Sequence, residues 1–421
     1  MRVTVRPGNF GGTLSVPPCK SLAHRFLIAA ALAGGRSKID NIEQSNDIKA
    51  TVGGLRELGA DISFNDRTAY ITGIKRFLPV MNIVNCGESG STLRFFIPVF
   101  SLTGDKVVFK GEGRLMQRPQ TVYSEIFRKR GLMFSQEGDF LTINGALTAG
   151  KYSVAGDVSS QFITGLLYAL SMCDGDSVIN ILPPFESRSY VLLTVDVLQK
   201  FGVSVCFYDD LTIKVKGGQK YVPGSFCVEG DYSQAAFWLV AGSICGDVKV
   251  NNLLPGSKQG DRVIVDILRR CGAAQEFGDN FVSCKKASLM ATEIDLSDCP
   301  DLGPVLMVLG LFCKGETVIS NAGRLRMKES DRILSMQSEL SKMGADIFSD
   351  RDTVFVRPSV LRDTYNLDSH NDHRVAMALA VASVCAGIEI DIDNAQAVDK
   401  SYPMFWNDLK SLGAEVVCYE R

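Results

Sequence analysis

Basic residues in short polar motifs are the first sign of chemistry in this chain. Lys20 and Arg25 flank the start of an Ala- and Leu-rich segment, and Arg118 lies in the motif GRLMQRP. The motifs RMKESDR, NDHR and DKSYP contribute four more cations: Lys328, Arg332, Arg374 and Lys400. Lys and Arg are costly inside a packed interface unless an anion compensates their charge. This set therefore predicts a site for a ligand with several phosphate or carboxylate groups.

Two carboxylates stand near these cations and could transfer protons. Asp301 precedes the apolar segment LGPVLMVLGL, and we expect it to cap the buried helix that this segment forms. Glu329 lies between Lys328 and Asp331. A carboxylate beside several cations should stay ionised, as a proton acceptor requires. Either residue could equally be structural, so at this point both roles stay open.

Composition excludes several other classes of site. The net charge is only −2, which gives no support to a nucleic-acid or anionic-membrane partner. The 12 cysteines form no C-x-x-C pair and there are only 3 histidines, so we expect no metal site. No G-x-S-x-G, P-loop or fitting G-x-G-x-x-G motif occurs. Apolar runs are too short to span a bilayer and the chain start has no apolar signal core, so we expect a cytoplasmic protein with reduced cysteines.

A repeat of about 70 residues positions these motifs. Six times the chain shows a helix end, a glycine and a short apolar strand, and the glycines are 69 to 72 residues apart. These glycines suit the position after a helix, where positive φ favours glycine: Gly59, Gly131, Gly202, Gly272, Gly344 and Gly413. About forty residues before each glycine, a polar cluster opens a helix that is apolar on most faces and should be buried.

We therefore predict an α/β chain of six β-α-β-α-β units, three in each of two similar domains. One domain comprises residues 19–229. The other comprises residues 230–421 together with 1–18, because we expect the N-terminal segment to pair with the second half. Each domain should enclose three buried helices, whose N-terminal ends carry free backbone N–H groups and a partial positive charge.

Taken in order along the whole chain, the polar motifs resemble those of the 5-enolpyruvylshikimate-3-phosphate synthase family. PPCKSLAHR resembles its G-S-K-S-x-x-x-R segment, CGESGSTLR its G-N-S/A-G-T-x-x-R loop, and RLMQRP its R-x-x-x-R-P motif. Four further elements follow as GDVSSQF, FESRSY, VEGDYSQAAFW and PDLGPVL. RMKESDR, NDHR and DKSYPMFW complete the set. Together, in order and at matching spacing, these motifs are highly specific.

The resemblance implies two inside-out α/β prism domains that close over their substrates. It implies an enzyme that transfers the enolpyruvyl group of phosphoenolpyruvate to the 5-hydroxyl of shikimate-3-phosphate and releases phosphate. The reaction would pass through a tetrahedral addition–elimination intermediate, without metal or organic cofactor, on the route to chorismate and the aromatic amino acids. These two small molecules are the implied partners, and we expect a monomer that binds neither nucleic acid nor membrane.

By motif position, the resemblance also implies which residues act. Those implied to contact shikimate-3-phosphate are Lys20, Ser21, Arg25, Ser159, Ser160, Ser187, Tyr190, Asp301 and Lys328. Those implied to contact phosphoenolpyruvate are Lys20, Gly90, Arg118, Gln161, Arg332, Arg374 and Lys400. Asp301 would accept the proton of the 5-hydroxyl. Glu329 and Lys400 would handle the proton that adds to the methylene carbon and later leaves it, and Lys20 completes the catalytic set.

A few positions depart from the family pattern. Glu88 stands where Asn is common, Ser91 replaces the usual Thr, and Arg324 occupies a position often held by Asn. Glu88 adds a carboxylate near the loop implied to bind phosphoenolpyruvate. None of these departures removes a charged group that the resemblance assigns to chemistry.

Two alternatives remain. The sister family that transfers enolpyruvate to UDP-N-acetylglucosamine shares the six-unit architecture, but it carries a reactive cysteine in the loop that reads RLMQRP here. This chain has no cysteine between Cys86 and Cys173. The second alternative is a non-catalytic protein that binds phosphorylated metabolites. Such a protein would keep the cations, but it would gain nothing from carboxylates such as Asp301 and Glu329 beside its ligand.

Overall fold

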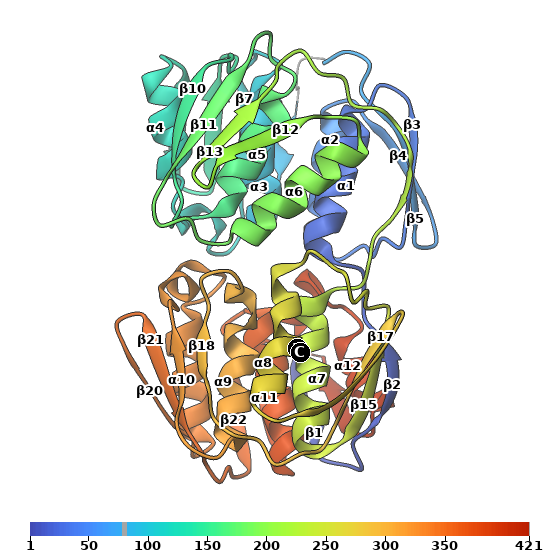
Figure 1. Cartoon of the computed structure of the whole chain (residues 1–421), viewed down its shortest axis with the longest axis vertical. Coiled ribbons are helices and arrows are strands. Elements are labelled where there is room, and N and C mark those ends of the chain that lie inside the picture. Colours follow the sequence, from blue (N-terminus) through green and yellow to red (C-terminus); the bar gives the residue numbers. More distant parts are fainter. Residues whose placement is uncertain (78–81, 421) are drawn as a thin grey trace. The chain divides into compact units, whose positions relative to one another are not determined.

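The computed structural model describes residues 1–77 and 82–420, and the chain divides into two compact units. Unit 1 comprises Met1–Cys19 and Glu229–Arg421, and unit 2 comprises Lys20–Val228. The chain therefore begins in unit 1, builds unit 2 without interruption, and then returns to unit 1. Each unit combines helices with four-stranded sheets (Figure 1).

Three apolar helices form the centre of unit 1. They are α7 (Tyr232–Cys245), α9 (Gly303–Phe312) and α11 (His373–Ala386), and they pack against one another. Nearly every residue of these helices is buried, because Ala, Val, Leu and Gly cover all of their faces. Trp238 of α7 stacks on Phe405 with ring centroids 5.0 Å apart, which ties the central helices to the outer layer.

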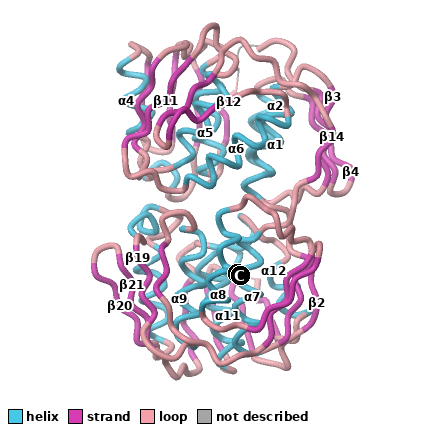
Figure 2. The backbone as a smooth tube through the Cα atoms, in the orientation of Figure 1, coloured by secondary structure: helices cyan, strands magenta, loops and turns pink. Residues whose placement is uncertain are grey.

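Short helices and sheets surround this centre, and Figure 2 shows strands on both flanks of the helices. The outer helices are α8 (Ile264–Arg270), α10 (Arg332–Lys342) and α12 (Phe405–Ser411). The 3-10 helices are η2 (Gly260–Val263), η3 (Pro300–Leu302), η4 (Gly323–Met327) and η5 (Ala395–Lys400).

Unit 1 has three four-stranded sheets of the same topology. The first has β16 (Ala274–Gly278), β17 (Phe281–Lys285), β15 (Asp247–Asn251) and β2 (Gly12–Ser15). The second has β18 (Glu293–Asp295), β19 (Thr317–Ser320), β21 (Thr353–Arg357) and β20 (Asp346–Asp350). The third has β22 (Thr364–Asp368), β23 (Ile390–Asp393), β1 (Arg2–Arg6) and β24 (Glu415–Tyr419).

The N-terminal residues complete two of these sheets. Strand β1 lies between β23 and β24 and is antiparallel to both, so that Val3 faces Ile392 on one side and Cys418 on the other. Strand β2 runs parallel to β15, with Leu14 beside Val250. The side chains of β1 that point inward are fully buried, which makes this short segment part of the core.

Unit 2 repeats the design around α1 (Lys20–Leu32), α3 (Gly90–Ser101) and α5 (Ser160–Leu170). Its outer helices are α2 (Asn46–Glu57), α4 (Thr121–Lys129), α6 (Arg188–Lys200) and the 3-10 helix η1 (Leu115–Gln117). One sheet has β14 (Ser225–Cys227), β3 (Arg36–Asp40), β5 (Thr68–Thr72) and β4 (Asp61–Asn65). A second sheet has β6 (Val84–Asn85), β7 (Val107–Lys110), β9 (Phe140–Asn144) and β8 (Met133–Glu137). A third has β10 (Lys151–Ala155), β11 (Ser177–Leu182), β13 (Thr212–Val215) and β12 (Val205–Asp209).

Six sheets with interleaved helices confirm the predicted α/β fold of repeated units. Each repeat has one strand more than the predicted β-α-β-α-β pattern, because the strand after each glycine turns back as a hairpin. Asp66, Gly138 and Arg351 adopt positive φ at three of these tight turns. In the sixth repeat the returning strand is β1, which comes from the other end of the chain. No helix within the described ranges is long and apolar enough to cross a bilayer.

We predict that Leu309→Ala in α9 lowers the free energy of unfolding of unit 1 by about 2–5 kcal/mol, because it leaves a cavity among the central helices. Both tryptophans, Trp238 and Trp406, lie in unit 1, so denaturant unfolding followed by tryptophan fluorescence measures this unit. Val360→Ala removes carbon atoms from a side chain that is 94% exposed and should leave the midpoint nearly unchanged. Equal shifts in the two variants would contradict the buried position of α9.

Candidate functional site

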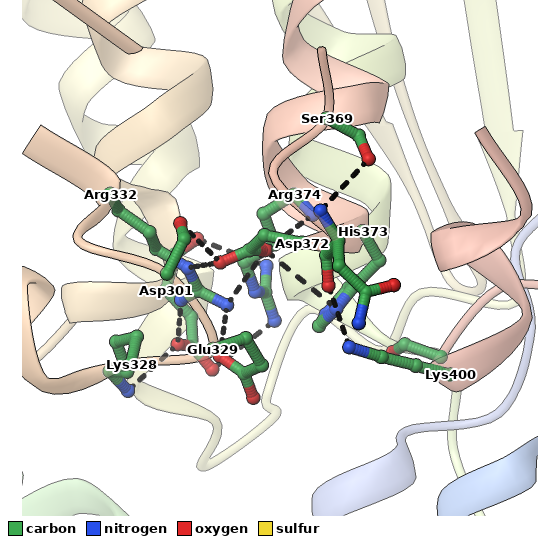
Figure 3. Close-up of polar contacts among 12 residues, drawn as sticks. Asp301, Lys328, Glu329, Arg332, Ser369, Asp372, His373, Arg374 and Lys400 are labelled. Carbon is green, nitrogen blue, oxygen red and sulfur yellow. Dashed lines mark hydrogen bonds and ion pairs between the residues drawn. The ribbon is translucent and has the colours of Figure 1, made fainter. Parts of the chain in front are cut away.

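The charged residues predicted in the C-terminal half gather at the N-terminal ends of the central helices of unit 1 (Figure 3). Asp301 lies in η3 directly before α9, and Arg374 lies in the first turn of α11. Lys328 and Glu329 precede α10, which begins at Arg332, and Lys400 is the last residue of η5. Helix starts present free backbone N–H groups, so the region is electropositive before any side chain is counted.

Asp301 is the centre of this cluster. Its Oδ1 accepts hydrogen bonds from Lys328 Nζ at 3.1 Å and from Arg332 Nη1 at 3.0 Å. Its Oδ2 accepts from Arg374 Nη2 at 3.2 Å, and its backbone carbonyl accepts from Arg374 Nη1 at 3.0 Å. Three cations from two segments of the chain, RMKESDR and NDHR, thus converge on one carboxylate.

The expectation that Asp301 caps the helix α9 is wrong. The residue before α9 is Leu302, which makes no capping bond, because the 3-10 turn of η3 occupies the place of a cap. Charge-assisted bonds to three cations are also stronger than one bond to a neutral N–H. True caps are found on the two neighbouring helices. Asp231 accepts from the backbone of Ser233 at 2.9 Å, and Asp372 accepts from the backbone N–H of Arg374 at 2.9 Å.

Arg332 connects the carboxylates of the cluster. Its side chain is 1% exposed, and its Nε donates to Asp372 Oδ2 at 2.8 Å while its Nη2 donates to Glu329 Oε2 at 2.8 Å. Asp372 is itself fully buried and also accepts from Ser330 Oγ at 3.2 Å. The guanidinium therefore holds Glu329 and Asp301 in a fixed arrangement, since each takes a different nitrogen of the same planar group.

The balance of burial and charge decides the protonation of these groups. Burial raises the pKa of Asp301, but Arg374, Lys328 and Arg332 outweigh burial and hold that pKa well below its usual range. Burial lowers the pKa of Lys328 to about 8 against the opposing attraction of Asp301. Burial also lowers the pKa of Arg332, but Asp372, Glu329 and Asp301 outweigh burial and hold that pKa above its ordinary value. Asp301 is therefore an ionised carboxylate at neutral pH.

Lys400 approaches the same cluster from the last repeat. Its Nζ donates to the backbone carbonyl of Asn371 at 2.6 Å, and the following residue, Ser401, accepts from Gln234 Nε2 of α7 at 2.7 Å. His370 and Asn371 both adopt positive φ, of 52° and 55°. Such conformations are uncommon for residues with a side chain and gather at binding sites. This bend turns the Asn371 carbonyl toward Lys400.

In unit 2, Arg25 joins the start of α1 to the start of α6. Its side chain is 2% exposed, and it donates to the carbonyl of Ser21 at 2.6 Å and the carbonyl of Tyr190 at 3.0 Å. Its Nε donates to Thr194 Oγ1 at 2.8 Å. Ser187, just before α6, has a positive φ of 54°. The arginine thus brings together Ser21 and Tyr190, two of the residues that the sequence singles out, and Ser187 lies three residues before Tyr190.

The starts of α3 and α5 also meet in unit 2. Gln161 Nε2 donates to Ser91 Oγ at 3.0 Å, and Gln161 Oε1 accepts from Arg94 Nη1 at 2.8 Å. Ser159 caps α5 by accepting from the backbone N–H of Gln161 at 3.3 Å, and the next residue, Ser160, is 5% exposed. Two hydroxyls and an amide therefore lie at the N-terminal end of one buried helix, where anions are favoured.

Lys20 and Arg118 supply the remaining cations of unit 2. Lys20 Nζ forms an ion pair with Asp47 at 2.7 Å. The guanidinium of Arg118 lies against the backbone of Gly90, where a Cβ would stand only 2.7 Å from Arg118 Nη1. A side chain at position 90 would displace that guanidinium, which explains why glycine begins α3 here.

Three contributors to the site were missed by analysis of the sequence. Asp372 holds Arg332, Asp47 holds Lys20, and Arg94 holds Gln161. Asp372 lies in the motif NDHR directly before α11, a position where capping is the ordinary role of an aspartate. Arg94 ends the motif CGESGSTLR, but its partner Gln161 is 67 residues away. Asp47 lies in none of the motifs, and its partner Lys20 is 27 residues away. Across residues 1–77 and 82–420, no group of three or more His, Cys, Asp or Glu residues is arranged to hold a metal ion.

Comparison with known proteins adds to this geometry. The family described as EPSP synthase (3-phosphoshikimate 1-carboxyvinyltransferase) matches residues 5–409. Proteins named 3-phosphoshikimate 1-carboxyvinyltransferase from Clostridium novyi (strain NT) and Clostridium kluyveri are each 42% identical to the chain and cover 98% of it, with 97% and 98% of their own lengths aligned.

Solved structures show the same fold. An EPSP synthase from Acinetobacter baumannii matches with a TM-score of 0.82 at 24% identity, over 99% of this chain and 100% of that one. The enolpyruvyl transferase NikO from Streptomyces tendae matches with a TM-score of 0.78 at 18% identity, over 99% of this chain and 98% of that one. At these identities the two structures support the architecture, and the Clostridium relatives carry the sequence similarity.

A half-buried ion pair lies on the bend that carries Asn371. Glu339 is 1% exposed and accepts from His370 Nε2 at 2.9 Å and from Lys342 Nζ at 2.6 Å. Burial raises the pKa of Glu339, but His370 and Lys342 outweigh burial and lower it to about 2. In turn, the hydrogen bond to Glu339 raises the pKa of His370 above its ordinary value.

We predict that this pair makes stability depend on pH. The pKa of His370 is raised in the folded protein, so the ion pair adds to the free energy of unfolding. This stabilisation is fully present below the unfolded-state pKa of about 6.5 and is lost as the pH rises through the folded-state pKa. Glu339→Gln should return the pKa of His370 toward about 6.5, measured by NMR titration of the histidine ring protons. Glu316→Gln, at an exposed ion pair with Arg357, is the control and should leave it unchanged. A His370 pKa that does not move in Glu339→Gln would contradict the pairing.

Proposed function

This chain belongs to the EPSP synthase family, and from that premise we propose that it transfers the enolpyruvyl group of phosphoenolpyruvate to the 5-hydroxyl of shikimate-3-phosphate and releases phosphate. Its activity would be that of a 3-phosphoshikimate 1-carboxyvinyltransferase, on the route to chorismate and the aromatic amino acids. The observation that carries the proposal is the ionised Asp301 held by Lys328, Arg332 and Arg374. Glu329 is bound to Arg332 as well. A proton acceptor and a second carboxylate inside a cluster of cations suit chemistry on a phosphorylated, carboxylated substrate.

We propose that the two substrates divide the site residues between them. Shikimate-3-phosphate would contact Lys20, Ser21, Arg25, Ser159, Ser160, Ser187, Tyr190, Asp301 and Lys328. Phosphoenolpyruvate would contact Lys20, Gly90, Arg118, Gln161, Arg332, Arg374 and Lys400. Hydroxyls and cations at helix starts support the first set, and guanidinium groups, which bind phosphate and carboxylate in a bidentate way, support the second.

The protons would move between these residues and the substrates. Asp301 would take the proton of the 5-hydroxyl as the hydroxyl oxygen attacks C2 of phosphoenolpyruvate. At the same time Glu329 or Lys400 would protonate the methylene carbon. The tetrahedral intermediate would then lose phosphate as the same methyl carbon gives up a proton. Lys20 would stabilise the charge that develops on the departing phosphate.

Substrate binding would itself prepare the base. In the ligand-free protein Arg332 and Arg374 hold the pKa of Asp301 far down, which makes it a weak proton acceptor. Once these arginines bind the phosphate and carboxylate of phosphoenolpyruvate, the anions offset their charge at Asp301. The pKa of Asp301 then rises toward the ordinary carboxyl range, where proton transfer from a hydroxyl is more favourable.

We further propose that residues 19–229 and residues 230–421 with 1–18 act as the two domains of a monomeric, cytoplasmic enzyme without a cofactor. Among the described residues no disulfide joins any of the 12 cysteines, which suits a reducing compartment. The motif RLMQRP, which has no cysteine, argues against UDP-N-acetylglucosamine as the acceptor.

The deciding experiment is a phosphate-release assay with shikimate-3-phosphate and phosphoenolpyruvate, each also omitted in turn. Release that requires both substrates is the expected result. Release only when UDP-N-acetylglucosamine replaces shikimate-3-phosphate would assign the chain to the sister activity. Binding of both substrates without release would make it a binding protein for phosphorylated metabolites.

We predict that Asp301→Asn and Glu329→Gln each lower kcat by about 10²–10⁴-fold, because each keeps its shape but can no longer exchange the proton. Steady-state kinetics and calorimetric substrate binding on the folded variants make the measurement. Asp266→Asn, at an exposed ion pair on α8, is the matched control and should keep normal kcat. If affinity collapses while kcat persists, the altered residue is a substrate contact instead of a proton carrier.

Arg374→Lys tests the guanidinium clamp. Lysine keeps the charge but cannot bind in a bidentate way, so we expect the KM for phosphoenolpyruvate to rise by about 10–100-fold, the equivalent of one charge-assisted hydrogen bond. Calorimetric affinity for shikimate-3-phosphate should change far less. Arg269→Lys, whose side chain is 61% exposed, is the control for the substitution itself. Equal losses for both substrates would show that Arg374 supports the fold and not one ligand.

A further inference from the structure

Two cysteines meet at the end of unit 1 where α7 and α11 finish. Cys245 is the last residue of α7 and Cys385 is the penultimate residue of α11, and their Sγ atoms are 3.9 Å apart. A disulfide needs about 2.05 Å between sulfur atoms, so the two Sγ atoms must move closer by only about 2 Å. Helix ends can supply such a movement because their last turns fray.

The pair can be reached from outside the protein. Cys245 and Cys385 are both partly exposed, and Cys245 lines a surface depression of about 790 Å³ between residues 9–13, which lead into β2, and the strands β15 and β17. A volume of this size is many times that of a water molecule, so a small oxidant can enter. Lys286 lines the same depression and brings a positive charge to the mouth of the pair.

The two thiols differ in character. The hydrogen bond with Cys385 lowers the pKa of Cys245 against the effect of burial, and Lys286 lowers it further. Burial and the hydrogen bond that Cys385 shares with Cys245 raise the pKa of Cys385. The thiolate is the reactive form of cysteine, so Cys245 is the thiol that reacts first and Cys385 is the one that resolves.

The other cysteines of the chain can be compared with Cys245 and Cys385 in thiol contact and exposure. Cys313 follows the end of α9 and its thiol interacts with that of Cys271, but each of these residues is only 1% exposed. Cys206, Cys227 and Cys418 are exposed, and none of them lies in contact with another cysteine among the interactions described. Within the described residues, only the pair at the ends of α7 and α11 combines thiol contact with access from the surface.

We propose that Cys245 and Cys385 form an oxidative modification site, which closes to an intramolecular disulfide when the protein meets hydrogen peroxide. The Cys245 thiolate attacks one peroxide oxygen, the O–O bond breaks, and a sulfenic acid and hydroxide form. The Cys385 sulfur then attacks the sulfenic sulfur, which releases the second oxygen as water. Two thiols and one peroxide thus become one disulfide and two waters, with two electrons passing from sulfur to oxygen.

The disulfide would join the fourth and sixth repeats behind the candidate site. Both helices are 14 residues long, so their N-terminal ends, which carry Asp231 and Asp372, lie about 21 Å from the cysteines. The modification site is therefore separate from the charged cluster, and its chemistry can be tested without an activity assay.

The test treats the full-length protein with hydrogen peroxide, blocks remaining thiols with iodoacetamide, and maps disulfides by mass spectrometry of non-reduced peptides. We expect a peptide pair linking Cys245 to Cys385, lost on reduction with dithiothreitol, before any link between Cys271 and Cys313. Cys418→Ser, at an exposed strand, is the control and should form the same link. Oxidation confined to the exposed cysteines Cys206, Cys227 and Cys418 would overturn the proposal.

Single substitutions test the order of reaction. In Cys385→Ser, Cys245 has no resolving partner, so a dimedone probe should trap its sulfenic acid at least about tenfold more than in the wild-type protein. In Cys245→Ser, labelling at Cys385 should stay near the wild-type level. Equal trapping in both variants would contradict the assigned order, and the wild-type peptide map decides the proposal even where a variant folds poorly.

Discussion

A buried apolar helix imposes one constraint on this molecule: its first backbone N–H groups need acceptors, although its sides need none. Six such helices form the centres of the two units, and each of their starts brings polar groups into the interior. Asp231 and Asp372 meet the need as caps, and Ser89 and Ser159 do the same in unit 2. The fold therefore creates electropositive, polar ends around dry cores, and the chain has placed its reactive groups at those ends.

The charge within unit 1 is balanced before any ligand arrives. Arg332 donates hydrogen bonds to Asp301, Glu329 and Asp372 at once. Arg374 donates to both the carboxylate and the backbone carbonyl of Asp301. Burying isolated cations at this density would be prohibitively costly, so the carboxylates make the cluster possible. Under the proposed function, an anionic substrate would replace one set of acceptors with another instead of bringing together bare charges.

The sequence predicts the repeat well because its signals are local. The glycine after each outer helix, such as Gly131, and the apolar helix before it recur at nearly constant spacing. The charged cluster could be anticipated because its members lie in short motifs at helix starts. What could not be anticipated depends on contacts distant in sequence: the pairing of Lys20 with Asp47 and the use of Asp301 as an ion-pair centre. The extra strand of each repeat was missed because a second hairpin strand carries no motif of its own.

The position of β1 has a consequence for the order in which the protein is made. This strand leaves the ribosome long before its neighbours β23 and β24, which follow roughly 400 residues later. At about 5–20 residues per second, the strand waits on the order of 20–80 s for its partners. During that time unit 2, which is continuous in sequence, can complete its sheets. Val3 and Val5, which end fully buried, spend this interval exposed to water. The charged residues Arg2 and Arg6 at either end of the strand discourage it from pairing with other nascent chains in the meantime.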